Sequence, residues 1–287
     1  MSEITGKTRL LGVIGHPIGH SLSPLMHNAA LTELGENYVY VAFPIKPDDL
    51  ATAIAGLESI GVVGFSVTIP HKQTIMPFLS QITPTAKLVG AVNTVWWTEQ
   101  GWQGTNTDVE GFVAPLTELD RDWWKVKPVV LGNGGAARAV VVGLAQLGCP
   151  EIQIVGRNLE KLEAFKNSWS RADFNSELSV YPWQALAELI PSTTLLINTT
   201  PLGMTPHLEQ SPVEEDLMQG LSSSAITYDL IYTPRPTRFL QQAADQGATI
   251  IDGLEMLVQQ GAAALRLWLQ KPVPVDTMRQ ALRDFIP

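Results

Sequence analysis

Strand-like and helix-like segments alternate along almost the whole of this chain of 287 residues. Short apolar runs such as residues 10–15 and 38–44 are followed by longer stretches with helical spacing. Helical crossovers of this length join parallel strands, because the helix returns the chain to the starting edge of the sheet. A polar break at residues 120–125 then interrupts the alternation, which resumes at residue 129. The sequence therefore predicts α/β architecture, and its length and the break predict two domains.

Charge and composition limit what the chain binds. The formal net charge is −9 and no basic run is present, which argues against nucleic acid and against an anionic membrane surface. The one cysteine, Cys149, excludes a disulfide framework, and the five histidines follow no metal-ligand spacing, so we expect no metal site. We see no apolar run long enough to cross a membrane and no signal-peptide core, so we expect a cytoplasmic protein.

A glycine turn between a strand and a helix predicts a dinucleotide site. Residues 129–139 read V-V-L-G-N-G-G-A-A-R-A, which matches G-x-G-x-x-A in the required strand–turn–helix setting. Gly132 permits the tight turn, Gly134 lets a pyrophosphate approach the backbone, and Ala137 allows close helix packing. The alternative is a glycine-rich turn that binds no ligand.

The end of the next expected strand indicates which dinucleotide binds. An NAD site usually has a carboxylate there for the ribose hydroxyls, but this chain has Gly156 and Arg157. Arg157 can pair with a 2′-phosphate, and Lys161 follows one helical turn later. This pattern favours NADP, although both residues could also be ordinary exposed charges at a helix start.

Lys72 is the candidate catalytic residue. It follows an apolar strand and Pro70, so we expect it in the first turn of a helix, where a cation is disfavoured. Taken alone, this segment favours a solvated surface lysine. Asp108 is a candidate partner, in a Thr107-x-x-Glu110 capping-box pattern that predicts a helix start.

A small carboxylate site is predicted near the N-terminus. Ser21 and Ser23 follow an expected strand and a glycine-containing loop, and Pro24 then opens a helix. Two hydroxyls at a helix start can bind a carboxylate. Ser23 is also a good helix N-cap in its own right.

Eight blocks together resemble the shikimate dehydrogenase family, from about residue 10 to the C-terminus. The blocks are G-H-S-L-S-P at residues 19–24, V-T-I-P-H-K at 67–72, G-A-V-N-T at 90–94, G-T-N-T-D-x-x-G at 104–111, the glycine turn at 132–139, N-T-T-P-L-G-M at 198–204, D-x-x-Y-x-P at 229–234 and G-x-x-M-L-V-x-Q at 253–260. The resemblance implies reversible reduction of 3-dehydroshikimate to shikimate with NADPH, a step toward aromatic amino acids.

The resemblance also implies roles for single residues. Lys72 and Asp108 would form the catalytic pair. The substrate would be bound by Ser21, Ser23, Thr68, Lys72, Asn93, Asp108, Tyr232 and Gln260. NADP would be bound by Gly132, Asn133, Gly134, Gly135, Ala136, Gly156, Arg157, Asn158, Lys161, Leu230 and Gly253. We expect residues 1–107 with the C-terminal helices in 254–287 to form the substrate domain, and residues 108–253 to form a Rossmann domain.

Three residues depart from the family pattern. Ser66 and Gly156 stand where asparagine is common, and Asn133 stands where alanine is usual. We also expect His71 to be exposed beside Lys72. The alternatives are a quinate/shikimate dehydrogenase that uses NAD, a non-catalytic relative that keeps the fold, and a folate-type methylene dehydrogenase. The expected partner is a small-molecule substrate, and the protein would be a monomer or a homodimer.

Overall fold

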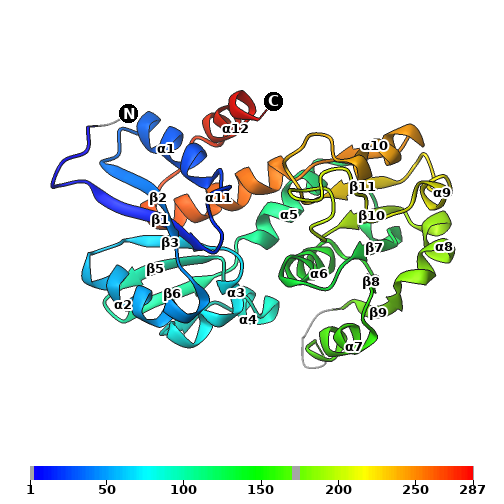
Figure 1. The fold of residues 1–287 in the computed structure, drawn as a ribbon, viewed down its shortest axis with the longest axis horizontal. Helices are drawn as coiled ribbons and strands as arrows, with labels where there is room; N and C mark the ends of the chain where they lie inside the picture. Colours follow the sequence, from blue (N-terminus) through cyan, green and yellow to red (C-terminus); the bar gives the residue numbers. More distant parts are fainter. Residues whose placement is uncertain (1–2, 170–174, 287) are drawn as a thin grey trace. The chain divides into compact units, whose positions relative to one another are not determined.

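The computed structural model describes residues 3–169 and 175–286, which divide into two compact units (Figure 1). Unit 1 comprises the chain up to Gly111 together with Leu257–Phe285, and unit 2 comprises Phe112–Met256. The chain leaves unit 1 within helix α5 (Asp108–Thr117) and returns to it within helix α11 (Leu254–Leu269). Each unit has its own sheet, as the alternating pattern predicts.

The sheet of unit 1 has six strands in the order β2-β1-β3-β5-β6-β4. The strands are β1 (Arg9–Gly15), β2 (Tyr38–Pro44), β3 (Gly64–Val67), β4 (Gln81–Ile82), β5 (Thr94–Thr98) and β6 (Gly101–Thr105). Strand β1 pairs in parallel with β2 and β3, whereas the β5–β6 hairpin adds an antiparallel partner to β3. The sheet is therefore mixed, and β1 and β3 end side by side at one edge.

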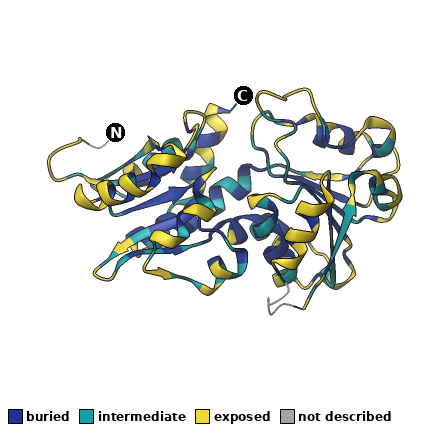
Figure 2. Cartoon of the chain, turned by 60° about the horizontal axis from the view of Figure 1, so that its bottom comes forward, coloured by how far each residue is buried: buried dark blue, intermediate teal, exposed yellow. Residues whose placement is uncertain are grey.

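Helices cover this sheet, and the C-terminal helices complete unit 1. The helices are α1 (Ser23–Glu33), α2 (Leu50–Ser59), α3 (His71–Thr74), α4 (Pro84–Val89), α11 and α12 (Val275–Phe285). Helix α12 packs against α1. One core cluster, which includes Ile14, Phe65 and Trp102, contains residues of β1, β3, α2 and β6. Figure 2 shows that the strands are largely buried and that the exposed residues lie mainly on helices and loops.

The sheet of unit 2 is parallel throughout, in the order β12-β11-β10-β7-β8-β9. The strands are β7 (Pro128–Leu131), β8 (Glu151–Gly156), β9 (Glu177–Pro182), β10 (Leu195–Asn198), β11 (Ile226–Asp229) and β12 (Thr249–Ile251). The helices are α6 (Gly135–Leu147), α7 (Leu159–Asn167), α8 (Leu186–Leu189), α9 (Glu215–Met218) and α10 (Arg238–Asp245). This is the doubly wound order of a Rossmann fold, with its switch point between β7 and β10. The predicted fold class is confirmed.

Some elements differ from the predicted ones. The apolar run before Lys72 predicts a strand over residues 61–69, but β3 is shorter, because the N–H groups of Gly61 and Val62 donate to carbonyls of α2 and end that helix instead. Strand β9 and helix α10 were not expected from the sequence. The expected domain limits, after residues 107 and 253, lie within a few residues of the unit limits.

Candidate active site

Lys72 lies on a single helical turn that other backbone segments hold in place. Helix α3 has only four residues, and Pro70 precedes it rather than forming its first residue. Lys72 does lie in the first turn of a helix, as expected, but a single turn carries little of a helix macrodipole, so the expected dipole effect on Lys72 is small. The carbonyl of Lys72 accepts a 2.7 Å hydrogen bond from the backbone N–H of Val92. This bond fixes the lysine backbone beside Asn93.

The Lys72 and Asp108 side chains form an ion pair. Lys72 Nζ lies 2.6 Å from Asp108 Oδ2, and the two side chains are 22% and 11% exposed. Asp108 opens α5, and its backbone N–H donates to Asn106 Oδ1 at 3.0 Å. The predicted helix start at Asp108 is confirmed, but the reciprocal bond of a capping box is not made, because the Thr107 N–H donates to Asn93 Oδ1 and Glu110 pairs with Arg266. The pair is sheltered but still reachable by a small ligand.

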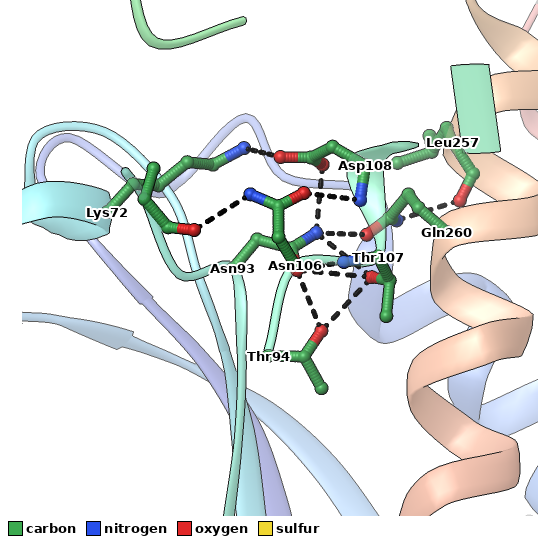
Figure 3. Close-up of polar contacts among 9 residues, drawn as sticks. Lys72, Asn93, Thr94, Asn106, Thr107, Asp108, Leu257 and Gln260 are labelled. Atoms are coloured by element: carbon green, nitrogen blue, oxygen red, sulfur yellow. Dashed lines mark hydrogen bonds and ion pairs between the residues drawn. The ribbon is translucent and has the colours of Figure 1, made fainter. Parts of the chain in front are cut away.

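Asn93 connects this pair to the C-terminal helix α11 (Figure 3). Its Nδ2 lies 2.8 Å from Asp108 Oδ1 and 3.4 Å from Gln260 Oε1. Its Oδ1 accepts a 2.7 Å hydrogen bond from the backbone N–H of Thr107. Because Asn93 is almost fully buried, these bonds lock its amide and set the orientation of the carboxylate. Four residues predicted for the site are thus brought together by hydrogen bonds.

Three further polar residues support the network and were not predicted as site residues. Thr94 Oγ1 donates to Asn93 Oδ1 at 3.0 Å and lies 3.1 Å from Thr107 Oγ1. Asn106 Nδ2 donates to the carbonyl of Ala91 at 3.0 Å. Their position beside Asn93 and Asp108 in the sequence was the available indication of this role.

The predicted serine residues and Thr68 are not among the residues of the network in Figure 3; Thr68 follows β3 and the serines lie at the start of α1. The backbone N–H of Thr68 donates to the carbonyl oxygen of Ile14 at 3.0 Å, so Thr68 lies where β1 and β3 end. Helix α1 begins at Ser23 rather than Pro24, and Ser23 N–H donates to Ser21 Oγ at 3.3 Å. Ser23 is therefore the first helical residue and not the expected N-cap.

One residue beside the site, His71, differs from expectation, and a second, Ser66, departs from the family pattern. His71 is fully buried rather than exposed, and its Nε2 lies 2.7 Å from the carbonyl oxygen of Ile45. The bond to a carbonyl requires a proton on Nε2. Ser66 accepts a 2.9 Å hydrogen bond from the buried Tyr40 hydroxyl. The chain therefore uses Ser66 to satisfy a polar group inside the sheet.

The predicted pyrophosphate turn has the shape that a phosphate needs. Gly132 has φ +102°, and a Cβ there would lie 2.8 Å from Thr199 Oγ1. Gly134 caps α6 with extended backbone, and Cβ atoms at Gly134 and Gly135 would meet nothing within 4 Å. The first N–H groups of a 13-residue helix are therefore open to an anion. Asn133 and Ala136 are half-buried in the same turn.

The end of β8 provides the predicted basic groups. Arg157 and Lys161 are exposed, at the strand end and in the first turn of α7. The Asn158 side chain caps α7 by accepting from the backbone of Lys161 at 2.9 Å. Gly156 is buried, and a Cβ there would lie 2.9 Å from Leu162 Cδ2, so close helix packing explains this glycine. These groups and the open turn fit an anionic dinucleotide with a 2′-phosphate.

Leu230, Tyr232 and Gly253 lie in unit 2. Gly253 packs directly on Leu230, because a Cβ there would lie 2.1 Å from the Leu230 carbonyl oxygen. Burial raises the pKa of the Tyr232 hydroxyl. Cys149 is buried, and burial raises the pKa of its thiol to about 12.

The described residues offer neither a metal site nor a membrane span. No group of three or more His, Cys, Asp or Glu side chains among residues 3–169 and 175–286 is placed to hold a metal ion. Within that same part of the chain, the helices are too short or too polar to cross a membrane.

Comparisons with known proteins agree on one family. Residues 13–95 match the shikimate dehydrogenase substrate binding domain, and residues 253–283 match the shikimate 5'-dehydrogenase C-terminal domain. A relative from Synechocystis sp., named shikimate dehydrogenase (NADP(+)), is 65% identical over 282 residues, which cover 98% of this chain and 97% of the relative.

Solved structures agree with these relatives. A crystal structure of shikimate dehydrogenase in complex with NADP+ superposes with a TM-score of 0.89 at 38% identity, covering 100% of this chain and 98% of its own. The Thermus thermophilus shikimate 5-dehydrogenase, in complex with NADP(H) and shikimate, has a TM-score of 0.84 at 32% identity, covering 96% of this chain and 99% of its own.

Proposed function

The chain belongs to the shikimate dehydrogenase family, and we propose that its Lys72–Asp108 pair carries the proton transfer of the family reaction. It is an oxidoreductase that reduces 3-dehydroshikimate to shikimate reversibly with NADPH, a step of aromatic amino-acid biosynthesis. The observation that supports the catalytic pair is the 2.6 Å contact between Lys72 Nζ and Asp108 Oδ2.

The proposed chemistry assigns a separate task to each residue. NADPH, when bound, supplies the hydride that reduces the ring ketone. Lys72, as an ammonium, stabilises the developing charge on the carbonyl oxygen and donates the proton that makes the hydroxyl. In the reverse direction the neutral amine of Lys72 accepts that proton. Asp108 orients the ammonium through one oxygen, while Asn93 Nδ2 holds its other oxygen at 2.8 Å.

The remaining site residues are proposed to hold the substrate. Ser21 and Ser23 would bind the carboxylate at the start of α1, where backbone N–H groups also favour an anion. Thr68, Asn93, Asp108 and Gln260 would bind ring hydroxyls, and Tyr232 would line the site. The geometry of Gln260 supports this proposal: its Nε2 is fixed by a 2.8 Å bond to the Leu257 carbonyl, while its Oε1 lies 3.4 Å from Asn93 Nδ2 and can exchange that longer contact for a substrate hydroxyl.

The cofactor is NADP, and we assign its contacts within unit 2. The pyrophosphate would lie on residues 132–136 and the first turn of α6. The 2′-phosphate would pair with Arg157 and Lys161, and Gly156 and Asn158 would border the adenosine. Leu230 and Gly253 would lie beside the nicotinamide. The open glycine turn and the basic end of β8 support these assignments.

We also propose a cytoplasmic location, since the single cysteine suits a reducing compartment and the net charge of −9 disfavours a polyanionic partner. We further propose that the protein is a monomer or a homodimer.

The proposed function is tested by initial rates of NADPH or NADH formation from shikimate and from quinate. We expect the highest kcat/KM with shikimate and NADP. Equal or higher kcat/KM with quinate and NAD would contradict the assignment and favour a quinate/shikimate dehydrogenase. Absence of turnover with every pair, in a protein that still binds NADP, would favour a non-catalytic relative.

A further inference from the structure

A buried carboxylate that the proposed chemistry does not use lies at the end of strand β11. Asp229 is 0% exposed and lies opposite Asn198, its neighbour in register on β10. Three groups donate hydrogen bonds to it: Asn198 Nδ2 at 3.0 Å, the backbone N–H of Ile231 at 3.1 Å and Thr237 Oγ1 at 2.6 Å. Such a ring of donors is complementary to an ionised carboxylate.

The direction of these bonds follows from the chemistry of the partners. An amide NH2 group and a backbone N–H can only donate. The Thr237 hydroxyl accepts from the backbone N–H of Leu240 at 3.3 Å, at the start of α10, and donates its own proton to Asp229 Oδ2. A protonated carboxyl could place its proton only on the Thr237 oxygen, whereas the ionised form accepts all three bonds. The three donors therefore favour the charged form, against the opposing effect of burial.

One oxygen of Asp229 shapes the backbone that borders the proposed nicotinamide site. The bond from Ile231 N–H spans Leu230 and fixes its peptide groups. Gly253 lies on this turn, with its N–H 3.0 Å from the Ile231 carbonyl and no room for a Cβ beside Leu230. A change at Asp229 is thus transmitted to both residues assigned to the nicotinamide.

The same carboxylate also connects to the pyrophosphate turn. Asn198, which donates to Asp229, accepts from the Thr200 hydroxyl at 2.7 Å through its Oδ1. The adjacent Thr199 hydroxyl donates to the carbonyl of Leu131 at 2.7 Å and lies beside Gly132. Two sets of polar contacts, joined through the adjacent residues Thr199 and Thr200, thus run along the carboxyl edge of this sheet from the glycine turn to Leu230.

We propose that Asp229, as a carboxylate, is a positioning residue for NADP that holds the Leu230 turn and the Asn198–Thr200 turn in their binding arrangement. Asp229 acts through these turns and is not assigned a contact with the cofactor. The inference rests on the proposed function, because it takes Leu230 and Gly253 as cofactor contacts.

The ionisation of Asp229 gives the proposal a measurable pH dependence. Burial raises its pKa to about 7, against the lowering effect of the hydrogen bonds from Thr237, Ile231 and Asn198. The negative charge of Asp252 adds a smaller upward effect, and Asp252 itself pairs with Arg235 at 2.6 Å. Protonation near neutral pH weakens the bonds from its donors, so NADP affinity should fall as the pH falls through about 7.

The test uses the full chain and titration calorimetry with NADP at pH 8 and pH 6, together with steady-state rates. Asp229→Asn keeps the shape and removes the charge, and Asp245→Asn, an exposed residue of α10, is the matched control. At pH 8 we expect D229N to bind NADP about tenfold more weakly, as for loss of a hydrogen bond to a charged group. The KM for NADP should rise, while the KM for shikimate stays near the wild-type value.

The pH comparison isolates the carboxylate. The wild-type and D245N affinities should both fall toward the D229N value at pH 6, whereas D229N should change much less. The 2′-phosphate of NADP titrates in all three proteins and cancels when they are compared. Thr237→Val, which keeps the carboxylate and removes one donor, should weaken NADP binding in the same direction and provides the test should D229N not fold.

Equal NADP affinity of D229N and wild type at pH 8 would overturn the proposal, as would an unchanged affinity in T237V where D229N does not fold. If the NADP affinities of wild type and D229N depended on pH identically, the ionised form of Asp229 would not be what supports NADP binding. Failure of the wild-type protein to oxidise shikimate would refute the proposed function instead, so the two failures are distinguishable.

Discussion

Replacement of His27 by phenylalanine is expected to protect the chain against acid. His27 is fully buried in α1, and neither ring nitrogen has a hydrogen-bond partner within the described part of the chain. Its ring stacks on Tyr40 with a centroid distance of 4.2 Å and lies 5.6 Å from Trp268. A proton on this ring would be a buried charge without a partner, so burial lowers the pKa of His27 to about 3.

The size of this stability change follows from the difference between the pKa values of His27 in the unfolded and folded chain. Between the ordinary pKa of 6.5 and the folded pKa of about 3, the unfolded chain binds a proton that the folded chain does not. Folding stability is therefore lost as the pH falls through this window, by about 1.4 kcal/mol per pH unit. The contribution of His27 amounts to about 2 kcal/mol by pH 5.

The assay is urea unfolding of wild type and His27→Phe at pH 8 and pH 5. A difference in packing between phenylalanine and histidine is the same at both pH values and cancels. The free energy of unfolding of H27F, relative to that of the wild type, should therefore be about 2 kcal/mol higher at pH 5 than at pH 8. The same advantage at both pH values would refute the argument, since it would mean that burial does not suppress protonation of His27.

Three further outcomes are expected. Asp229 changes stability in the opposite direction, because its folded pKa of about 7 lies above the usual 3.8. The free energy of unfolding of the wild type should fall by about 3 kcal/mol relative to that of D229N as the pH rises from 4 to 7. The same change of unfolding free energy with pH in both proteins would contradict this. Gly132→Ala should lower the free energy of unfolding by about 1 to 2 kcal/mol, measured in urea, because its φ is positive and Thr199 leaves no room. Arg157→Ala should raise the KM for NADP about tenfold in steady-state assays and leave the KM for NAD unchanged, and an equal rise for both would exclude a 2′-phosphate contact.

Local patterns were sufficient to predict the elements that depend on local physics. The strand–helix alternation and the glycine turn at Gly132 depend on apolar spacing and on a backbone conformation that favours glycine, and both are recovered in the structure. The order of the strands in unit 1 could not be predicted this way. The β5–β6 hairpin pairs antiparallel with β3, and strand partners are chosen by packing rather than by the sequence of one strand.

In the site, too, the residue types could be predicted but the contacts between distant segments could not. The residue types at Lys72, Asp108 and Asn93 follow from the family resemblance, but the hydrogen bond between Asn93 and Gln260 joins residues 167 positions apart. Two local interpretations were wrong for a related reason. The Thr107 hydroxyl hydrogen-bonds to Asn93, and the His71 ring hydrogen-bonds to the carbonyl of Ile45. Both partners lie elsewhere in the chain, so the local sequence cannot reveal them.

Proton transfer by Lys72 is tested by the kcat of Lys72→Ala for shikimate oxidation with NADP. Lys125→Ala is the matched control, because Lys125 also forms an ion pair, with Asp122, but is well exposed. We predict that kcat of K72A falls by at least about a hundredfold, as for loss of a general acid–base group, while NADP affinity is retained. The K125A variant should keep wild-type kcat. A folded K72A with near wild-type kcat would contradict the account.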